Sequence, residues 1–524
     1  MHDVIVVGAG SAGAALAARL SEDPKRSVLL LEAGRDWRSA EAPKEARSSN
    51  IMAMMHGPDF QAEWQWPKLF TRRTRVQQPK FYWRGKALGG SSLVNAQIAI
   101  WGVGAAFDAW AEAGCEGWSA KDVLPLFAKI EDDPAMTGVA HHGQGGPIPI
   151  YRAPLETWGP VDKGLRAAAL AEGYSWNPDL NDPAREGVSC YPINSRDLKR
   201  VTTNDGYLEP ARGRANLTIR GGALVDRVLF ADGRASGVRV RLDGAWQDLP
   251  AREVVLCAGA VHSPAILLRS GLGPAAELSA LGIPVVRDLP DVGRHFMDHP
   301  VVRATIDLKP EHACRDPDAR HTNCCVTYSS GLEGGGFRDM ILIGFNHRNL
   351  PADGVTPNPQ GAVAAGLFEA HSRGSITLAS ADPETDPVVE ENMLDDPRDL
   401  ARMRDGTRRL ARLSTHPALR DIATRISFTE SGLPMDKVAA LPDGELDALL
   451  LEQAADIQHA AGTCRMSAYE DPRGVVDPDL RVKGVAGLRV ADAAIMPADC
   501  RANTHLTCVM IGEWLARRMA VEAA

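Results

Sequence analysis

The feature that most constrains the fold of this chain is a Gly-x-Gly-x-x-Gly pattern at residues 8–13. It follows an apolar run at residues 4–7 and precedes an alanine-rich stretch, and Glu32 stands at the end of the next apolar run. A strand, a glycine turn, a helix and a second strand in this order predict a βαβ unit with parallel strands over residues 3–34. Such glycines let the backbone approach a pyrophosphate at a helix N-terminus, and an acidic residue after the second strand accepts hydrogen bonds from a ribose. The pattern therefore predicts a dinucleotide site made of Gly8, Gly10, Gly13 and Glu32, without distinguishing FAD from NAD.

Length and composition argue against several classes of protein. With 524 residues the chain exceeds the roughly 250 to 300 residues that one hydrophobic core organises, so we expect two domains. A net charge of −9 and the lack of a Lys/Arg run argue against a nucleic acid partner. The nine cysteines form no Cys-x-x-Cys pair, so we expect neither disulfides nor a metal site, and a cytoplasmic location. We also expect no signal peptide, and no transmembrane segment, because no apolar run approaches the roughly 20 residues needed to cross a bilayer.

A second glycine-rich turn lies at residues 85–95 and contains Gly90, Ser91 and Asn95. It offers backbone N–H groups and hydroxyls to an anion, as the first turn does. Two such turns in one chain indicate a long cofactor that is contacted both at its pyrophosphate and at its far ring.

The last seventy residues place two imidazoles and a carboxylate, His459, His505 and Asp492, close together in the sequence. A cofactor site at one end of the chain and acid–base groups at the other indicate a redox enzyme.

The remaining pattern predicts most of the secondary structure. Alternating apolar residues predict strands between 216 and 240 with a hairpin turn at Asp232-Gly233, and a buried strand follows at 253–257. In the next helix, at 265–269, we expect Ser263 to be the N-cap and Pro264 to lie in the first turn. Residues 105–130 and 397–415 are expected to be helical, residues 301–380 to be rich in strands, and a last helix to start near His505.

Two long motifs resemble the signatures of one enzyme family. Residues 85–95 resemble the first signature of the glucose–methanol–choline (GMC) oxidoreductases, and residues 259–273 resemble the second. The glycine pattern at the start and the His459 and Asp492 segments extend the resemblance over the whole chain, and residues 292–299 are a weaker likeness. The resemblance implies an FAD-dependent alcohol oxidoreductase of the choline-dehydrogenase-like kind.

The resemblance also implies an α/β fold (α+β overall) with two domains that are discontinuous in sequence. A Rossmann-like FAD-binding domain is expected to comprise residues 1–150, 190–300 and 455–524. A substrate-binding domain, built on a mostly antiparallel sheet, is expected to comprise residues 151–189 and 301–454.

Site residues are implied by position. Gly8, Gly10, Gly13 and Glu32 would hold the ADP moiety with Val225 near the adenine, Gly90, Ser91 and Asn95 would lie along the pyrophosphate and flavin, and Asp492 would lie beside the ribityl chain. Some members of the family bind FAD covalently through a histidine just before the position of Asn95. Val94 stands there in this chain, so we expect FAD to be bound non-covalently.

The resemblance places His459 and His505 at the catalytic pair. An imidazole with a pKa near 6.5 suits removal of a hydroxyl proton while a hydride leaves for flavin N5. We therefore predict that His459 is the base and that His505 hydrogen-bonds the substrate oxygen. The N-terminus of the last helix would stabilise the anionic N1–C2=O locus of the reduced flavin.

Two other functions remain open on the sequence. The family includes flavin-containing hydroxynitrile lyases, and a noncatalytic FAD-binding protein is a further alternative that the two histidines disfavour. The sequence identifies neither the alcohol, nor the electron acceptor, which is oxygen or another compound, nor the oligomeric state. We expect specificity to come from residues 35–80 and from the sheet at 301–380.

Overall fold

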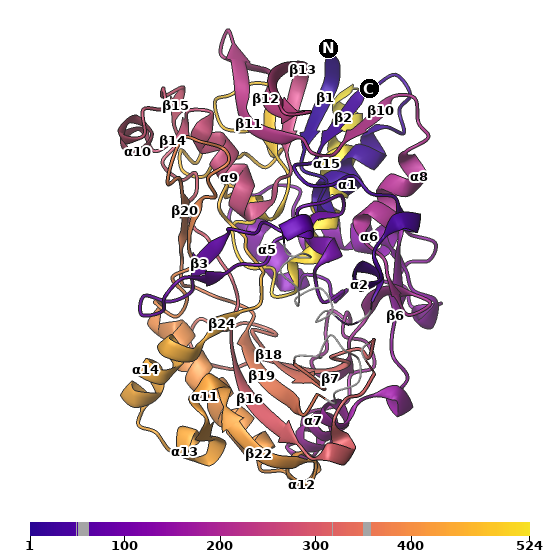
Figure 1. The fold of residues 1–524 in the computed structure, drawn as a ribbon, viewed down its shortest axis with the longest axis vertical. Helices are drawn as coiled ribbons and strands as arrows, with labels where there is room; N and C mark the ends of the chain where they lie inside the picture. Colours follow the sequence, from indigo (N-terminus) through magenta and orange to yellow (C-terminus); the bar gives the residue numbers. More distant parts are fainter. Residues whose placement is uncertain (49, 51–61, 317, 349–357, 524) are drawn as a thin grey trace.

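The chain is organised around two large sheets, one in each half of the molecule (Figure 1). The structure, a computed structural model, describes residues 1–48, 50, 62–316, 318–348 and 358–523. Both termini lie in the half that contains the first sheet (Figure 1). No helix in the described part of the chain is long and apolar enough to cross a membrane.

The first sheet has a parallel core with an antiparallel extension. Five strands pair in parallel in the order β10-β2-β1-β13-β25: Leu217–Arg220, Val28–Leu31, His2–Val7, Ala245–Leu256 and Leu488–Val490. The other end of β13 continues into antiparallel β12 (Arg234–Leu242) and β11 (Leu224–Ala231). Asp232 and Gly233 join these two strands with φ angles of 50° and 74°, so the predicted hairpin is confirmed.

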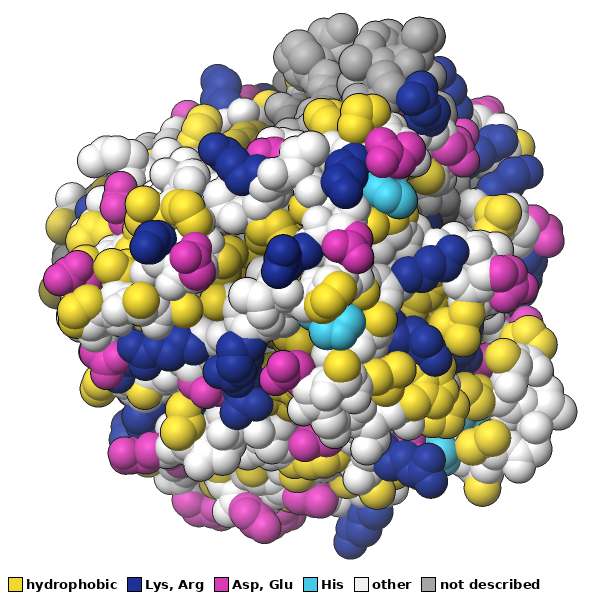
Figure 2. All heavy atoms as spheres, turned by 90° about the horizontal axis from the view of Figure 1, so that it is seen from below, with side chains coloured by type: hydrophobic (Ala, Val, Ile, Leu, Met, Phe, Trp, Pro, Cys, Tyr) yellow, Lys and Arg dark blue, Asp and Glu magenta, His cyan; other side chains and the backbone are white. Residues whose placement is uncertain are grey.

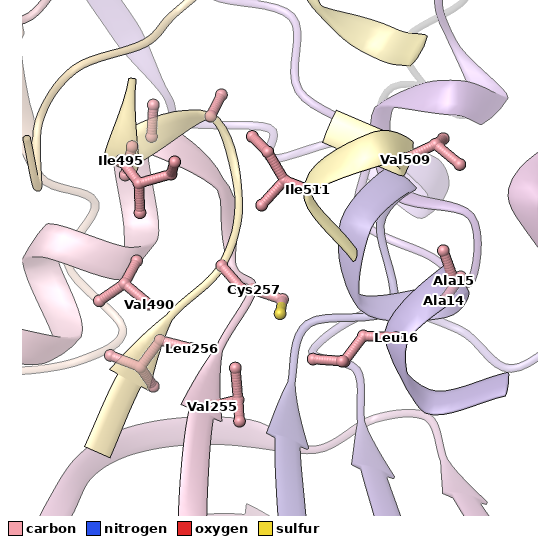
Figure 3. Packing of buried hydrophobic residues seen from close by; sticks show 14 of the residues in the cluster. Ala14, Ala15, Leu16, Val255, Leu256, Cys257, Val490, Ile495, Val509 and Ile511 are labelled. Carbon is pink, nitrogen blue, oxygen red and sulfur yellow. The ribbon is translucent and has the colours of Figure 1, made fainter. Parts of the chain in front are cut away.

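Three helices pack on this sheet. Their N-terminal ends and the C-terminal ends of the parallel strands border the cavity described below. The helices are α1 (Ser11–Leu20), α9 (Gly259–Arg269) and α15 (Thr504–Ala523). Leu16 of α1, Cys257 after β13 and Ile511 of α15 lie in one core (Figure 3). Small residues of α1, such as Ala14 and Ala15, are fully buried, which lets α15 pack closely against it. The predicted last helix near His505 is confirmed.

Helix α9 is longer than predicted and begins at Gly259, with Pro264 inside it. Ser263 is not its N-cap, because its hydroxyl donates to Asp492 Oδ2 at 2.6 Å and accepts from the N–H of Ala258 at 3.0 Å. Pro264 has no N–H for the carbonyl of Ala260 one turn earlier. The hydroxyl of Thr463 donates to that carbonyl at 2.6 Å, which explains why a proline is accommodated in this helix.

The second sheet is antiparallel throughout, as predicted. Its strands follow the order β23-β22-β16-β19-β18-β17-β7, with β24 beside β16: Leu433–Pro434, Ala423–Phe428, Pro300–Leu308, Gln360–Leu367, Met340–Phe345, Cys324–Tyr328, Gly187–Cys190 and Ala455–Asp456. Alternate residues of β16, such as Val302 and Ala304, enter a core shared with Met403 and Leu410 of α11 (Pro397–Ser414). The opposite face of β16 therefore points away from this helix.

Shorter elements connect the two sheets. A four-stranded sheet joins β3 (Phe70–Arg72) and β4 (Lys80–Phe81) to β20 (Ser375–Thr377) and β21 (Val388–Glu390). The expected helical stretch at 105–130 is divided into α5 (Gly104–Glu112) and α6 (Ala120–Ile130), because Gly114 and Gly117 turn the chain with positive φ. The remaining elements include α2 (Lys44–Arg47), β6 (Ile148–Tyr151), α7 (Pro160–Ala171), β8 (Ile193–Arg196), α10 (Ala275–Ala280), α12 (Pro417–Arg420), α13 (Met435–Ala439) and α14 (Asp443–Gln453).

Candidate active site

One cavity contains almost all of the predicted site residues. Its lining includes Gly8, Gly10, Glu32, Gly90, Ser91, Asn95, Val225, His459, Asp492 and His505. Gly13 does not line it, because a Cβ on Gly13 would stand 1.9 Å from the carbonyl oxygen of Gly8. Gly13 therefore lets α1 approach the end of β1 closely. Its role is in packing next to the cavity and not in lining it.

The two glycine turns meet at the backbone. A Cβ on Gly90 would lie 2.7 Å from Cα of Gly10, and Gly90 has a φ of +50°. Gly8 has a φ of +100°, and a Cβ there would collide with the carbonyl of Cys257. Bare backbone at this junction, next to the first turn of α1, is the environment that a pyrophosphate requires.

Glu32 lies at the end of β2 and is 7% exposed. Its two carboxylate oxygens accept from the N–H groups of Ala9 and Gly34, both at 2.9 Å. Burial raises the pKa of Glu32, and these two hydrogen bonds oppose the shift. Each carboxylate oxygen accepts more than one hydrogen bond, so Glu32 both fixes the first glycine turn and fits a ribose.

Asp492 connects three segments around the cavity. Its Oδ2 accepts from the N–H of Gly259 at 2.8 Å and from Ser263, and its Oδ1 accepts from the N–H of Ala494 at 2.7 Å. Burial raises its pKa, and the hydrogen bonds favour the charged form. The carboxylate thereby holds the start of α9 and the short helix Ala493–Ile495 against the cofactor-sized cavity.

His459 is the first member of a buried chain of polar side chains. Its Nδ1 lies 2.7 Å from Nδ1 of His299, and Nε2 of His299 lies 2.6 Å from Oδ2 of Asp499. On the other side of the ring, Nε2 of His459 lies 2.9 Å from the side-chain nitrogen of Asn503. His459 follows β24 and His299 precedes β16, so the pairing of these strands brings the two rings together.

The partners of this chain fix the proton positions on His459. Burial alone would raise the pKa of Asp499, but His299 outweighs it and lowers the pKa, so Asp499 is ionised and accepts from Nε2 of His299. In its neutral form His299 has a lone pair on Nδ1, and His459 then donates to it. This leaves the lone pair of His459 on Nε2, where the Asn503 amide donates. Burial, followed by the charge of His299 when that ring is protonated and by the charge of Arg84, holds the pKa of His459 well below its usual value, so the His459 ring is neutral.

His505 presents a free ring nitrogen to the same cavity. Its Nδ1 lies 2.8 Å from the hydroxyl of Ser11, and its Nε2 is buried without a partner in the described part of the chain. Burial first, and then Arg200, lowers the pKa of His505 to about 4, so the ring is neutral. If Ser11 donates to Nδ1, then Nε2 carries the proton and is a hydrogen-bond donor.

His299, Asp499 and Asn503 were not predicted as site residues. The segment 292–299 carried a family likeness, but no local pattern connects His299 to His459 across 160 positions. Asp499 lies 200 positions from His299. Contacts between residues so far apart in the sequence can be recognised only once the pairing of the strands is known.

The wall opposite the glycine turns comes from the second sheet. Arg303, Ile343 and Phe345 of this sheet line the cavity, which agrees with the expected contribution of residues 301–380 to the pocket. Trp66 of the segment 35–80 also lines it, stacked on His262 with the ring centroids 3.9 Å apart. Residues 49 and 51–61 of that segment lie outside the described residues.

A second group of ligating side chains lies outside the cavity. His142 Nδ1 is 2.6 Å from Glu131 Oε1, and its Nε2 is 3.0 Å from Asp179 Oδ2, which His141 also contacts. Burial lowers the pKa of His142, but the two carboxylates outweigh it and raise the pKa to about 9. A protonated His142 bridges Glu131 and Asp179, while Oε2 of Glu131 has no hydrogen-bond partner among the described residues. The side chains of this group are of the types that bind a metal ion.

Comparison with known proteins identifies the family of this chain. Family models described as GMC oxidoreductase match residues 2–301 and 370–512. The 5-(hydroxymethyl)furfural oxidase of Methylovorus sp. (strain MP688) is 34% identical over 100% of this chain and 99% of that protein. An oxygen-dependent choline dehydrogenase of Yersinia pseudotuberculosis is 33% identical over 99% of this chain and 93% of that protein.

The fold comparison leads to the same family. The crystal structure of pyridoxine 4-oxidase from Mesorbium loti superposes with a TM-score of 0.88, at 28% identity and 99% coverage of both chains. The chain therefore belongs to the GMC oxidoreductase family.

Proposed function

We propose that this flavin-dependent oxidoreductase oxidises a primary or secondary alcohol to the carbonyl compound, with His459 as the base. FAD, when bound, accepts the hydride at flavin N5. The observation that carries the proposal is the lone pair of His459 Nε2, which faces a cavity shared with both glycine turns. A substrate hydroxyl that replaces the Asn503 amide at this lone pair is placed to transfer its proton to His459.

The chain behind His459 supports this role. After proton transfer His459 is a cation, and its Nδ1–H donates to His299, which in turn donates to the ionised Asp499. A buried imidazolium is costly unless it is paired, and Asp499 supplies the compensating charge through His299. His299 and Asp499 are therefore positioning residues.

His505 is proposed to donate its Nε2–H to the substrate oxygen. This hydrogen bond strengthens as the oxygen gains negative charge. The N-terminus of α15, at Thr504, adds positive potential at the same place and would stabilise the anionic locus of the reduced flavin.

We propose that FAD is held without a covalent bond. Gly8, Gly10 and Glu32 would hold its ADP part near Val225, while Gly90, Ser91, Asn95 and Asp492 would hold the part that leads to the flavin. The side chain of Val94 lies at the cavity and has no group that forms a bond to the flavin. Acid precipitation should release all the yellow colour into the supernatant, and colour that stays with the protein would contradict this proposal.

We further propose a cytoplasmic enzyme with oxygen or another compound as electron acceptor. The nine cysteines are all unpaired, which suits a reducing compartment. The domain division at residues 1–150, 190–300 and 455–524 against 151–189 and 301–454 is likewise a proposal. It is supported by the strands of the parallel sheet and by most strands of the antiparallel sheet, whereas β24 (Ala455–Asp456) pairs within the antiparallel sheet although it falls in the range 455–524.

The test is anaerobic reduction of the bound flavin by a panel of alcohols, followed by admission of air. The relatives give the panel, which comprises 5-(hydroxymethyl)furfural, choline and pyridoxine, extended by benzyl alcohol. Bleaching of the flavin by an alcohol supports oxidation, and the rate of reoxidation in air separates an oxidase from a dehydrogenase. Cleavage of a cyanohydrin while the flavin stays oxidised would support the lyase instead.

A further inference from the structure

Arg303 places a positive charge on the sheet wall of the cavity. Its neighbours along β16, Val302 and Ala304, enter the core beneath α11, so the side chain of Arg303 points to the opposite face of the sheet. That face lines the cavity that also contains His459. Among the residues that the structure describes, no side chain forms a hydrogen bond or an ion pair with this guanidinium.

The row of residues beside Arg303 contains no carboxylate. Arg303 lies opposite Ala364 of β19, Ala364 lies opposite Ile343 of β18, and Ile343 lies opposite Cys325 of β17. The guanidinium of Arg303 is therefore the only charged group in this row of four paired residues, since the other three are small or apolar.

The nearest carboxylates are already engaged. Asp456 accepts from Arg73 Nε at 2.9 Å and from Gln458 at 2.6 Å. Glu430 is paired with Arg348 at 3.3 Å. Burial, and then the charges of Arg348 and Arg73, lower the pKa of Arg303 to about 10, which leaves it charged at neutral pH. The local excess of charge around Arg303 is positive.

A partly buried guanidinium without a protein partner is costly, and an anion that reaches it removes part of that cost. The guanidinium offers a planar set of donors that matches a carboxylate. In this cavity the anion has to be a group of the bound ligand, because the neighbouring carboxylates already have cationic partners.

We propose that Arg303 binds a carboxylate at the end of the substrate opposite the reacting hydroxyl, so that the enzyme prefers hydroxy acids with an apolar body. This inference rests on the proposed function, because His459 has to face the hydroxyl. Val301 of β16 pairs with Ala455, which stands four residues before His459. Arg303 lies two residues beyond Val301 on the same strand, a separation of about 7 Å between Val301 and Arg303. Ile343 and Phe345, which line the same wall, would contact the apolar body.

The experiment compares two alcohols of nearly equal shape, 4-(hydroxymethyl)benzoate and the neutral 4-(hydroxymethyl)benzamide, by anaerobic stopped-flow reduction of the flavin. A short-chain pair, 6-hydroxyhexanoate and its amide, tests a flexible body. In the parent enzyme we expect the carboxylates to have a higher kcat/KM, by about tenfold to a hundredfold, since a hydrogen bond to a charged group is lost with the amide. Arg303→Gln should abolish this preference by lowering kcat/KM for the carboxylate to about that for the amide, while Arg303→Lys should retain part of it.

Arg425→Gln is the matched control, because Arg425 lies on the same sheet, is paired with Asp307 and does not line the cavity. It should keep the preference for carboxylates. Binding of 4-methylbenzoate, followed by the change in flavin absorbance, gives a readout without turnover and should weaken about tenfold in Arg303→Gln. The FAD content and melting temperature of each variant check that it is folded.

The outcomes separate the two proposals. Equal use of acid and amide by the parent enzyme, or an undiminished preference in Arg303→Gln, would overturn the carboxylate site while the amide still reduced the flavin. If no alcohol reduced the flavin, the proposed function would fail. Binding of 4-methylbenzoate that depended on Arg303 would then still support the carboxylate site, and binding that did not would overturn it.

Discussion

At the scale of single residues, the reactivity of His459 depends on where its protons lie. The ring has a hydrogen-bond partner on each nitrogen, and Asp499 determines the direction of donation along the whole chain. The sequence predicted His459 and His505, since their segments carry a family likeness, and the structure places both at one cavity. It could not predict His299 and Asp499 as their partners, because no local pattern encodes a contact between segments so far apart.

We expect His459→Ala to bind FAD but to lose flavin reduction by about 10²- to 10⁴-fold, the usual contribution of a positioned acid–base group. His505→Asn should be milder, because an amide N–H still donates to the substrate oxygen. Stopped-flow reduction with a saturating alcohol measures both. A nearly normal rate in His459→Ala together with an inactive His505→Asn would reverse the two roles.

Asp499→Asn should reverse the hydrogen bonds of the chain. The amide N–H would donate to Nε2 of His299, His299 Nδ1 would then donate to His459, and the proton of His459 would move to Nε2. We expect flavin reduction to fall at least about tenfold, since the base has lost its lone pair. His299→Phe, which removes the partner without imposing the wrong direction, should be less impaired, and the opposite ranking would contradict the proposed direction of donation.

The pH dependence should report His299. Burial lowers the pKa of His299, but Asp499 outweighs it and raises the pKa above the usual value of 6.5. Protonated His299 donates to Nδ1 of His459 and leaves the proton on Nε2, so the reduction rate should fall as the pH falls through this raised pKa. In Asp499→Asn this pH dependence should disappear, because His299 donates to Nδ1 of His459 in both of its protonation states. A midpoint identical in both enzymes would assign the ionisation to another group.

At the scale of secondary structure elements, periodicity predicted most strands, and prolines and glycines caused the errors. The hairpin at Asp232-Gly233 was predictable because its turn chemistry is local. The start of α9 was not, because Pro264 is tolerated inside the helix only through Thr463, 203 positions from the carbonyl of Ala260 to which it donates. A proline is read as a first-turn residue when nothing in the neighbouring sequence indicates a replacement donor.

This replacement donor is testable by a double-mutant cycle. Thr463→Val should destabilise the protein by about 1 to 3 kcal/mol, because the buried carbonyl of Ala260 loses its partner. In the Pro264→Ala background the restored backbone N–H serves that carbonyl, so the same substitution should cost clearly less. Urea unfolding of the four FAD-bound proteins measures the coupling, and equal costs in both backgrounds would refute the explanation.

At the scale of the whole molecule, the chain passes repeatedly between the two sheets. The parallel sheet takes strands from residues 2–31, 217–256 and 488–490, and the antiparallel sheet takes strands from residues 187–190, 300–367 and 423–456. The family resemblance predicted this alternation, whereas composition alone predicted only more than one domain. On the surface seen in Figure 2, cationic and anionic side chains are interspersed.

FAD should stabilise the molecule as a whole, because the cavity contacts both sheets. At a free concentration one hundred times its Kd, FAD should add about 2.7 kcal/mol to the free energy of unfolding. Glu32→Ala removes a proposed ribose ligand and the acceptor for two backbone N–H groups, so it should require more FAD for the same increase in Tm. Thermal unfolding over an FAD titration measures this, and an unchanged FAD requirement would exclude Glu32 as a ribose ligand.

The pairing of β24 with β16 has a mechanical consequence. It attaches His459 and His299 to the antiparallel sheet, whereas Asn503 and His505 belong to the entry of α15, which packs on α1 of the parallel sheet. A hinge movement that widened the gap between the sheets would keep the two rings of the His459–His299 pair together and would separate His459 from Asn503 and His505. In the proposed mechanism, the base and the group that binds the substrate oxygen are therefore attached to different sheets, and the rate of flavin reduction should depend on how tightly the two sheets are held together.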